Sequence, residues 1–121
     1  MSDAHDPQLL KGILTLLLLS LLAEQESYGY ELVQRLHALG LDGIADGTVY
    51  PALARLEREG RIAARLVSSR SGPARKYYHP TDAGYAALTQ GRLGWQTLRA
   101  VVDPVLTRPV APRPAPPSPE D

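Results

Sequence analysis

The sequence of 121 residues predicts a mostly α-helical fold with one small β-hairpin, in the order three helices, two strands and a long C-terminal helix. Three observations predict it. Residues 9–24 are dominated by leucine, residues 28–39 and 48–59 carry apolar side chains at helical spacing, and two strand-like stretches flank Gly72-Pro73. At this length we expect one core, with an N-terminal arm over 1–8.

The first predicted helix, residues 9–24, is apolar nearly all round, which is typical of a helix buried on more than one side. A second copy of the chain is the simplest cover for the other face. The apolar run 13–23 is shorter than a membrane span, and the residues before it are acidic, unlike those of a signal peptide. Together with the absence of cysteine, this predicts a cytoplasmic protein.

The second and third helices are expected at 28–39 and 48–59, with Gly40 and Gly60 as their stops. We expect Ser27 to cap the second helix and Asp46 or Thr48 to cap the third. In the third helix the apolar face consists of Val49, Leu53 and Leu56. The opposite face and its flanks carry Thr48, Tyr50, Pro51, Arg55 and Arg58.

Residues 61–69 and 75–80 are predicted to pair as antiparallel strands around a turn at 71–74. Thr81 is expected to cap the last helix, 81–106, which Pro104 should interrupt near its end. Along this helix Leu88, Trp95, Leu98, Val102 and Val105 form a heptad-like seam, with Gly91 at the missing position. Such a seam favours packing against another helix.

The segment 107–121 contains six of the eleven prolines and shows no apolar periodicity. It is predicted to be disordered or polyproline-like. Two interpretations stay open for it: an inert tail, or a proline-rich ligand for a domain of another protein.

Charge is distributed unevenly although the total is zero. Residues 1–46 have two basic and seven acidic side chains, a net charge of −5, whereas residues 47–79 have seven basic and two acidic ones, a net charge of +5. A basic segment that covers the third helix and the hairpin indicates a polyanionic partner.

The order of elements is that of a winged helix-turn-helix over residues 9–80. An α-helix fits the major groove of DNA, so the third helix can offer Thr48, Tyr50, Pro51, Arg55 and Arg58 to bases and phosphates. The hairpin can place Arg70, Arg75 and Lys76 along the phosphates. Arg55 could alternatively serve only as the partner of Glu59 at i,i+4, and Tyr50 as core packing.

Three motifs carry a resemblance to a known family: YGYEL at 28–32, GTVYPALARLEREG at 47–60 and GPARKYYHPTDAG at 72–84. With them the sequence resembles the PadR family of bacterial transcriptional regulators, over roughly residues 9–105. The short C-terminal part resembles the compact subfamily, in which a single helix after the winged domain mediates dimerisation.

The resemblance implies a homodimeric repressor that binds a palindromic operator in double-stranded DNA. It implies DNA contacts at Tyr28, Tyr50, Arg75 and Lys76, and a dimer interface built from the first and last helices. The interface residues would be Leu14, Leu17, Leu18, Leu21, Leu88, Trp95, Leu98 and Val102. Trp95 matches an aromatic residue that lines a pocket for hydrophobic effectors at the dimer centre; ordinary interface packing is the other explanation for it.

Other classes of function are not supported by the sequence. His5, His37 and His79 lie in three separate elements, and no phosphate-binding loop or nucleophile motif occurs, so we expect neither an enzyme nor a metal or cofactor site. The alternative to a DNA-binding regulator is a winged-helix module that binds another protein and has lost DNA binding. The neutral total charge is the feature that favours this alternative.

Overall fold

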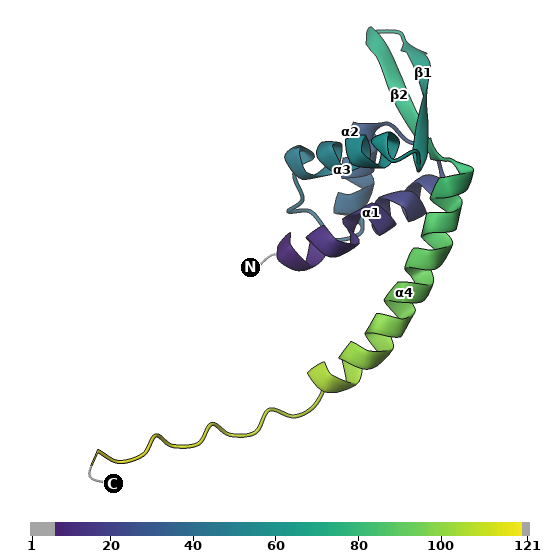
Figure 1. The fold of residues 1–121 in the computed structure, drawn as a ribbon. Helices are drawn as coiled ribbons and strands as arrows, with labels where there is room; N and C mark the ends of the chain where they lie inside the picture. The colour runs from purple at the N-terminus through teal and green to yellow at the C-terminus, as the bar shows by residue number, and fades with distance from the viewer. Residues whose placement is uncertain (1–6, 120–121) are drawn as a thin grey trace.

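The computed structural model describes residues 7–119 and confirms the predicted fold class. Three helices, α1 (Pro7–Glu24), α2 (Gly29–Ala38) and α3 (Asp46–Arg58), form a body from which the hairpin of β1 (Ile62–Ser69) and β2 (Gly72–Pro80) projects (Figure 1). The long helix α4 (Asp82–Leu106) begins beside this body and then extends away from it. The predicted arm at 1–8 lies mostly outside the described residues.

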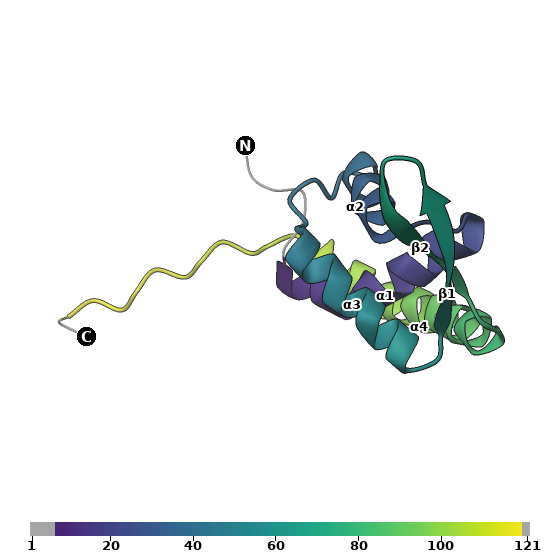
Figure 2. The ribbon, with the colours of Figure 1, turned by 90° about the horizontal axis from the view of Figure 1, so that it is seen from above.

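The core is made by leucine-rich faces of the first three helices. Figure 2 shows α3 crossing above α1, with α2 and the hairpin beside them. In α3 the buried residues are Val49, Leu53 and Leu56, the face that helical spacing predicts. The largest fully buried side chains also include Leu18 of α1, Leu32 and Leu36 of α2 and Ile62 of β1.

Both short helices end as predicted at a glycine in the left-handed region, with φ of 105° at Gly40 and 74° at Gly60. Leu41 N donates to Leu36 O at 3.1 Å, and Arg61 N donates to Leu56 O at 2.9 Å. These bonds satisfy carbonyls that would otherwise be left without a donor at the helix ends. The sharp second stop leads directly from α3 into β1.

The expected N-terminal caps of α2 and α3 were wrong. Tyr28 occupies the N-cap position of α2 and Ala45 that of α3, and neither provides a side-chain cap. Ser27 is instead buried one position earlier, where its Oγ accepts a hydrogen bond from Arg35 Nη1 at 2.8 Å. The third cap is confirmed: Thr81 Oγ1 accepts from Gly84 N at 3.1 Å at the start of α4.

The hairpin turn lies two residues earlier than predicted. Ser69 pairs with Gly72, so Arg70 and Ser71 form the tip, while Gly72 and Pro73 already belong to β2. Ser27 also pairs with Tyr78 on the other edge of β2, with Tyr78 N donating to Ser27 O at 2.9 Å. The base of the hairpin is thereby joined to the α1–α2 connection.

The helix α4 is not interrupted at Pro104, contrary to the prediction. It continues to Leu106, and Thr107 N still donates to Asp103 O at 3.0 Å. A proline removes one backbone donor, and here the helix needs to continue for only two further residues. Residues 109–118 then form no helix, strand or turn and run out as an exposed, extended segment (Figure 1).

Candidate nucleic-acid interface

One face of α3 is open to solvent and carries the residues that the sequence predicted for contact with DNA. Thr48, Pro51, Arg55 and Arg58 are exposed, while the opposite face is buried in the core. Arg55 Nε lies 3.1 Å from Glu59 Oε2, so the alternative partner considered for Arg55 is present in the free chain. Both side chains are exposed, and pairs of this kind contribute little to stability.

Tyr50 serves both as packing and as exposed surface. A Cβ at position 29 would lie only 2.2 Å from Tyr50 Cε1, which shows that the phenol ring packs directly on Gly29 at the start of α2. The residue nevertheless keeps 42 % of its surface exposed. Burial, and secondarily the nearby Asp46 carboxylate, raises the pKa of Tyr50, so its hydroxyl remains a hydrogen-bond donor at neutral pH.

On one face of the hairpin, Arg75 and two tyrosines form a stack. The Arg75 guanidinium carbon lies 4.5 Å from the centre of the Tyr28 ring, and Tyr28 meets Tyr77 edge to face at 5.3 Å. A guanidinium over an aromatic ring gains a modest electrostatic attraction and loses freedom of orientation. Arg75 is thus held beside the first turn of α2.

The side chain of Lys76 projects from the opposite face of the hairpin. Its Nζ lies 3.1 and 3.3 Å from the two carboxylate oxygens of Glu57, in the last helical turn of α3, and 5.5 Å from the centre of the Tyr78 ring. The hydrogen bond to Glu57 raises the pKa of Lys76, so the ammonium stays charged. Arg70, at the tip, is exposed.

Carboxylates of the same chain pair with three of the six basic side chains of α3 and the hairpin, and with Arg61 between the two elements. Besides the pairs of Arg55 and Lys76, Arg61 lies 3.8 Å from Glu59, and Arg65 donates hydrogen bonds to both carboxylate oxygens of Glu26. Within residues 7–119, Arg58, Arg70 and Arg75 have no carboxylate at ion-pair distance. The basic segment is therefore less available to an external anion than its formal charge suggests.

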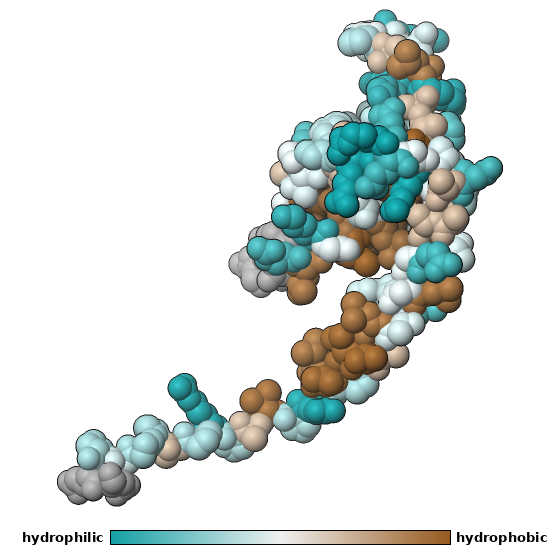
Figure 3. All heavy atoms as spheres, viewed as in Figure 1, coloured by the Kyte–Doolittle hydropathy of each residue, from teal (hydrophilic) through white to brown (hydrophobic). Residues whose placement is uncertain are grey.

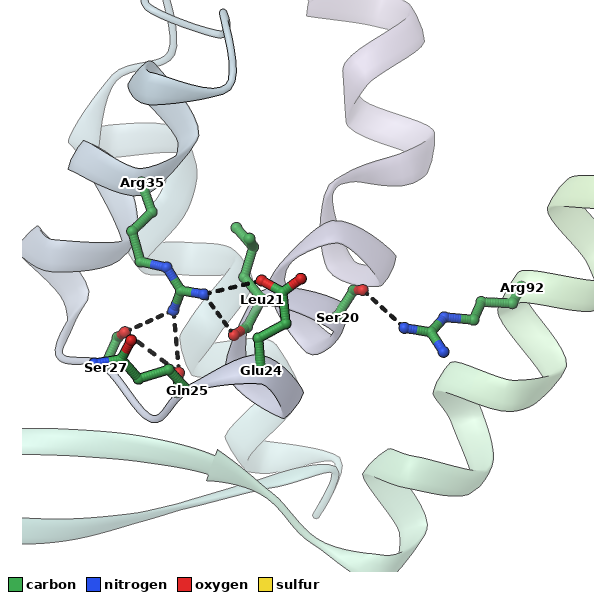
Figure 4. A network of polar contacts seen from close by, with 7 residues as sticks. All are labelled: Ser20, Leu21, Glu24, Gln25, Ser27, Arg35 and Arg92. Atoms are coloured by element: carbon green, nitrogen blue, oxygen red, sulfur yellow. Dashed lines mark hydrogen bonds and ion pairs between the residues drawn. The ribbon is translucent and has the colours of Figure 1, made fainter.

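Sequence reasoning missed the role of Arg35, which joins α1 to α2 (Figure 4). Its guanidinium donates to Leu21 O at 2.8 Å, Gln25 O at 3.0 Å and Ser27 Oγ at 2.8 Å, and pairs with Glu24 at 3.3 Å. It thus satisfies carbonyls at the C-terminus of α1. These partners lie 8 to 14 residues away, beyond any helical spacing that the sequence reveals.

A groove of about 910 Å³ separates α1 from α4, with Leu88, Arg92 and Trp95 among its lining residues. Its apolar walls also include Leu9, Ile13, Leu16 and Leu17 of α1, and Leu98, Val102 and Leu106 of α4. Figure 3 shows hydrophobic surface on the body and on the outer half of α4, facing each other. The two helices touch closely as far as the middle of α4: Arg92 Nη2 donates to Ser20 Oγ at 3.1 Å, and a Cβ at Gly91 would lie 2.5 Å from Leu16 Cδ1.

The residues predicted for a dimer interface separate into two groups. Leu14, Leu18, Leu21 and Leu88 are buried within the single chain and have almost no surface left for a second copy, although Leu88 also contributes to the wall of the groove. By contrast, Leu17, Trp95, Leu98 and Val102 line the groove, and Trp95 is 45 % exposed. Any interface at this place is thus expected to use the second group.

Residues 7–119 include no cluster of His, Cys, Asp or Glu with the geometry of a metal site. His5 lies outside the described residues. His37 Nε2 is 2.8 Å from Ile44 O, a contact that links α2 to the loop before α3. Over the same range, no helix combines the length and the apolar character that a bilayer crossing requires.

Comparison with known proteins identifies relatives along most of the chain. Residues 18–90 match the family described as "Transcriptional regulator PadR-like family". The Mycobacterium tuberculosis transcriptional regulator Rv3488 is 40 % identical over 78 residues, 63 % of this chain and 69 % of that protein. An uncharacterised protein of Lysinibacillus sphaericus is 30 % identical over 97 residues, 78 % of this chain and 89 % of the relative.

Solved structures agree with this fold. The PadR-like transcriptional regulator of Bacillus cereus superimposes with a TM-score of 0.75 at 36 % identity, covering 84 % of this chain and 99 % of the other. A PadR family regulator of Eggerthella lenta gives the same TM-score and identity, covering 83 % and 87 %. The relatives whose names state a role are regulators of transcription and not enzymes.

Proposed function

Because the chain belongs to the PadR-like family of transcriptional regulators, we propose that it is a cytoplasmic, homodimeric repressor that binds an inverted-repeat operator. The observation that carries the proposal is the position of the exposed face of α3 next to the cations of the hairpin. DNA-binding regulation follows from the family; the dimer, the operator symmetry, the repression and the effector are the proposed parts.

In the proposed complex, α3 enters the major groove with Thr48, Pro51, Arg55 and Arg58 toward the bases and phosphates. Arg70, Arg75 and Lys76 of the hairpin follow the phosphate backbone. Tyr28 and Tyr50 flank the first turn of α2, which has no side-chain cap, and the phenol of Tyr50 is a hydrogen-bond donor for a phosphate there.

The groove between α1 and α4 supports the proposed dimer. Leu98 is 56 % exposed in the single chain, and the outer half of α4 has no packing partner on its apolar side (Figure 3). Apolar surface of this extent is costly in water, and a second copy related by a two-fold axis would cover both grooves at once. Two symmetric α3 helices then require half-sites about one helical turn, roughly 10 bp, apart.

A planar hydrophobic effector is proposed to stack on Trp95 within the dimer. Bound there, it would favour a different spacing of the two α3 helices and release the operator. Trp95 is the single tryptophan, so its fluorescence reports the site directly. We expect planar aromatic compounds to change this fluorescence saturably and to weaken DNA binding; an unchanged signal would leave Trp95 as interface packing.

The decisive experiment is a gel shift with the DNA upstream of the protein's own gene, combined with sedimentation to determine the mass. We expect a dimer and a retarded complex at low salt, which an inverted repeat within that DNA accounts for. For Arg75→Ala the slope of log K against log salt should fall by about 0.9 for the lost phosphate contact. A folded protein that retards no duplex would contradict the proposal.

The second candidate, a module that binds a protein instead of DNA, draws on the internal ion pairs of Arg55, Arg65 and Lys76. A protein partner would then dock on α3 or the hairpin. The same experiment separates the two candidates. A DNA-binding regulator should form a retarded complex that contains no other protein, and its affinity for DNA should fall steeply as the salt concentration rises.

A further inference from the structure

Two adjacent residues of β2 have different partners in the free chain. Because successive side chains of a strand point to opposite faces, Arg75 lies over the neutral ring of Tyr28, 4.5 Å from its centre, while Lys76 contacts the carboxylate of Glu57. Stacking leaves the charge of Arg75 uncompensated. The charge of Lys76, in contrast, is balanced by a group of the same sign as a phosphate.

The Glu57 carboxylate presents both oxygens to Lys76 Nζ, at 3.1 and 3.3 Å, in the way that a phosphate would present its oxygens. The two side chains are 37 % and 48 % exposed, so a phosphate could reach the ammonium. When Lys76 turns to a phosphate, Glu57 loses its cation and remains as a negative charge beside the DNA. Both consequences oppose the contact between Lys76 and DNA.

We infer that Glu57 competes with DNA phosphates for Lys76 and thereby lowers the sequence-independent affinity of the protein for DNA. The inference rests on the proposed function and adds an attenuating residue to it. Contacts with phosphates supply nearly all of non-specific binding. A carboxylate that pairs with one cation of the hairpin therefore weakens binding to every duplex whose bases make no favourable contacts with α3.

The test uses the full chain and a fluorescein-labelled 30-bp duplex of random sequence, titrated by anisotropy at several salt concentrations. Glu57→Gln is expected to bind about threefold to fivefold more tightly than the wild type at low salt. Its slope of log K against log salt should steepen by up to about 0.9, the value for one phosphate contact, because Glu57 no longer keeps Lys76 from a phosphate in part of the complexes. Glu57→Ala, a second variant without the carboxylate, retains high helix propensity and should behave alike.

Glu26→Gln is the matched control, since it also removes one negative charge and one carboxylate that pairs with a hairpin cation, Arg65, but leaves Lys76 untouched. It should leave the affinity nearly unchanged. In the Lys76→Gln background, Glu57→Gln should lose most of its effect, because the cation that it would release is absent. Circular dichroism on each variant establishes that it is folded.

Three results would overturn the inference while the proposed function stands. The first is weaker DNA binding by Glu57→Gln, which would mean that the ion pair positions the hairpin for binding. The others are a gain in affinity by Glu26→Gln as large as that by Glu57→Gln, or an undiminished gain by Glu57→Gln in the Lys76→Gln background. A folded wild-type protein that binds no duplex at low salt would instead contradict the proposed function itself, and the inference with it.

Discussion

The body formed by α1, α2 and α3 differs from the outer half of α4 in how completely a single chain buries the apolar residues. In the body, Leu18, Leu36, Leu53 and Leu56 have no exposed surface. Along α4, by contrast, burial ends near Gly91, and Trp95 and Leu98 remain about half exposed. The same kind of residue thus has a partner within the chain in one region and has none in the other.

This difference indicates which part of the molecule one chain can stabilise. Burial of apolar area is the main favourable contribution to folding, so the body should fold as a unit on its own core. The outer half of α4 gains little from its own chain and should depend on a second copy. Stability in the first region should therefore be independent of protein concentration, and stability in the second should depend on it.

The largest expected effect comes from a core truncation paired with a groove truncation. Leu18→Ala removes a fully buried side chain of α1 and should cost about 2–5 kcal/mol in the free energy of unfolding, at every protein concentration. Leu98→Ala should change the stability of the single chain by less than about 0.5 kcal/mol, since the side chain is exposed there. Urea unfolding at several concentrations, with sedimentation, measures both.

For Leu98→Ala we expect weaker association. The fraction of dimer should be lower than that of the wild type at equal concentration, and the urea midpoint of unfolding should rise with protein concentration. The comparison between the two regions would fail if Leu98→Ala lost as much stability as Leu18→Ala in dilute protein. It would also fail if neither variant changed the dimer fraction.

Two glycines of α4 provide a smaller test in opposite directions. A Cβ at Gly84, where α4 joins the body, would lie 2.0 Å from the carbonyl oxygen of Arg61, a backbone atom that cannot move freely. Gly84→Ala should therefore destabilise by about 1–3 kcal/mol. At Gly94 nothing lies within 4 Å of such a Cβ, and Gly94→Ala should stabilise the helix by up to about 1 kcal/mol.

Thermal unfolding of the two variants at low concentration measures this pair. A stabilising Gly84→Ala would mean that α4 does not join the body as closely as the carbonyl of Arg61 indicates. If Gly94→Ala lost stability only at high concentration, the surface of a second copy would lie against position 94.

Local patterns in the sequence predicted what depends on neighbouring residues. The buried face of α3, the cap at Thr81 and the glycine stops at Gly40 and Gly60 each depend on residues within one or two helical turns. Their physical causes are helical periodicity, one hydroxyl and a positive φ. These are local properties, so one sequence suffices to recognise them.

What depends on distant residues was missed. Ser27 was expected to cap α2, but its hydroxyl instead accepts a hydrogen bond from Arg35, eight residues away. Lys76 pairs with Glu57, which lies 19 residues away in the sequence. No spacing rule connects such pairs. Likewise, the all-apolar α1 could not reveal which of its leucines the same chain covers, so buried residues such as Leu14 and Leu18 were grouped with the open Leu17.

The smallest expected effect compares an ion pair of the body with one on α4. In the body, hydrogen bonds from Arg65 lower the pKa of the Glu26 carboxyl below its ordinary value of 4.5. A carboxyl group with a lowered folded-state pKa stabilises the protein above its unfolded-state pKa, and this contribution is lost as the pH falls from about 4.5 through the folded-state value. Arg99 and Asp103 on α4 lie 3.8 Å apart, both largely exposed.

We therefore expect the unfolding temperature of Glu26→Gln to fall less than that of the wild type between pH 6 and pH 3.5, since glutamine has no proton to bind. Asp103→Asn, which removes the loose pair on α4, should follow the wild-type pH dependence closely. Scans of the three proteins at equal concentration measure the difference. If Asp103→Asn flattened the pH dependence as much as Glu26→Gln, the ion pairs of the two regions would be equivalent, although their apolar contacts differ.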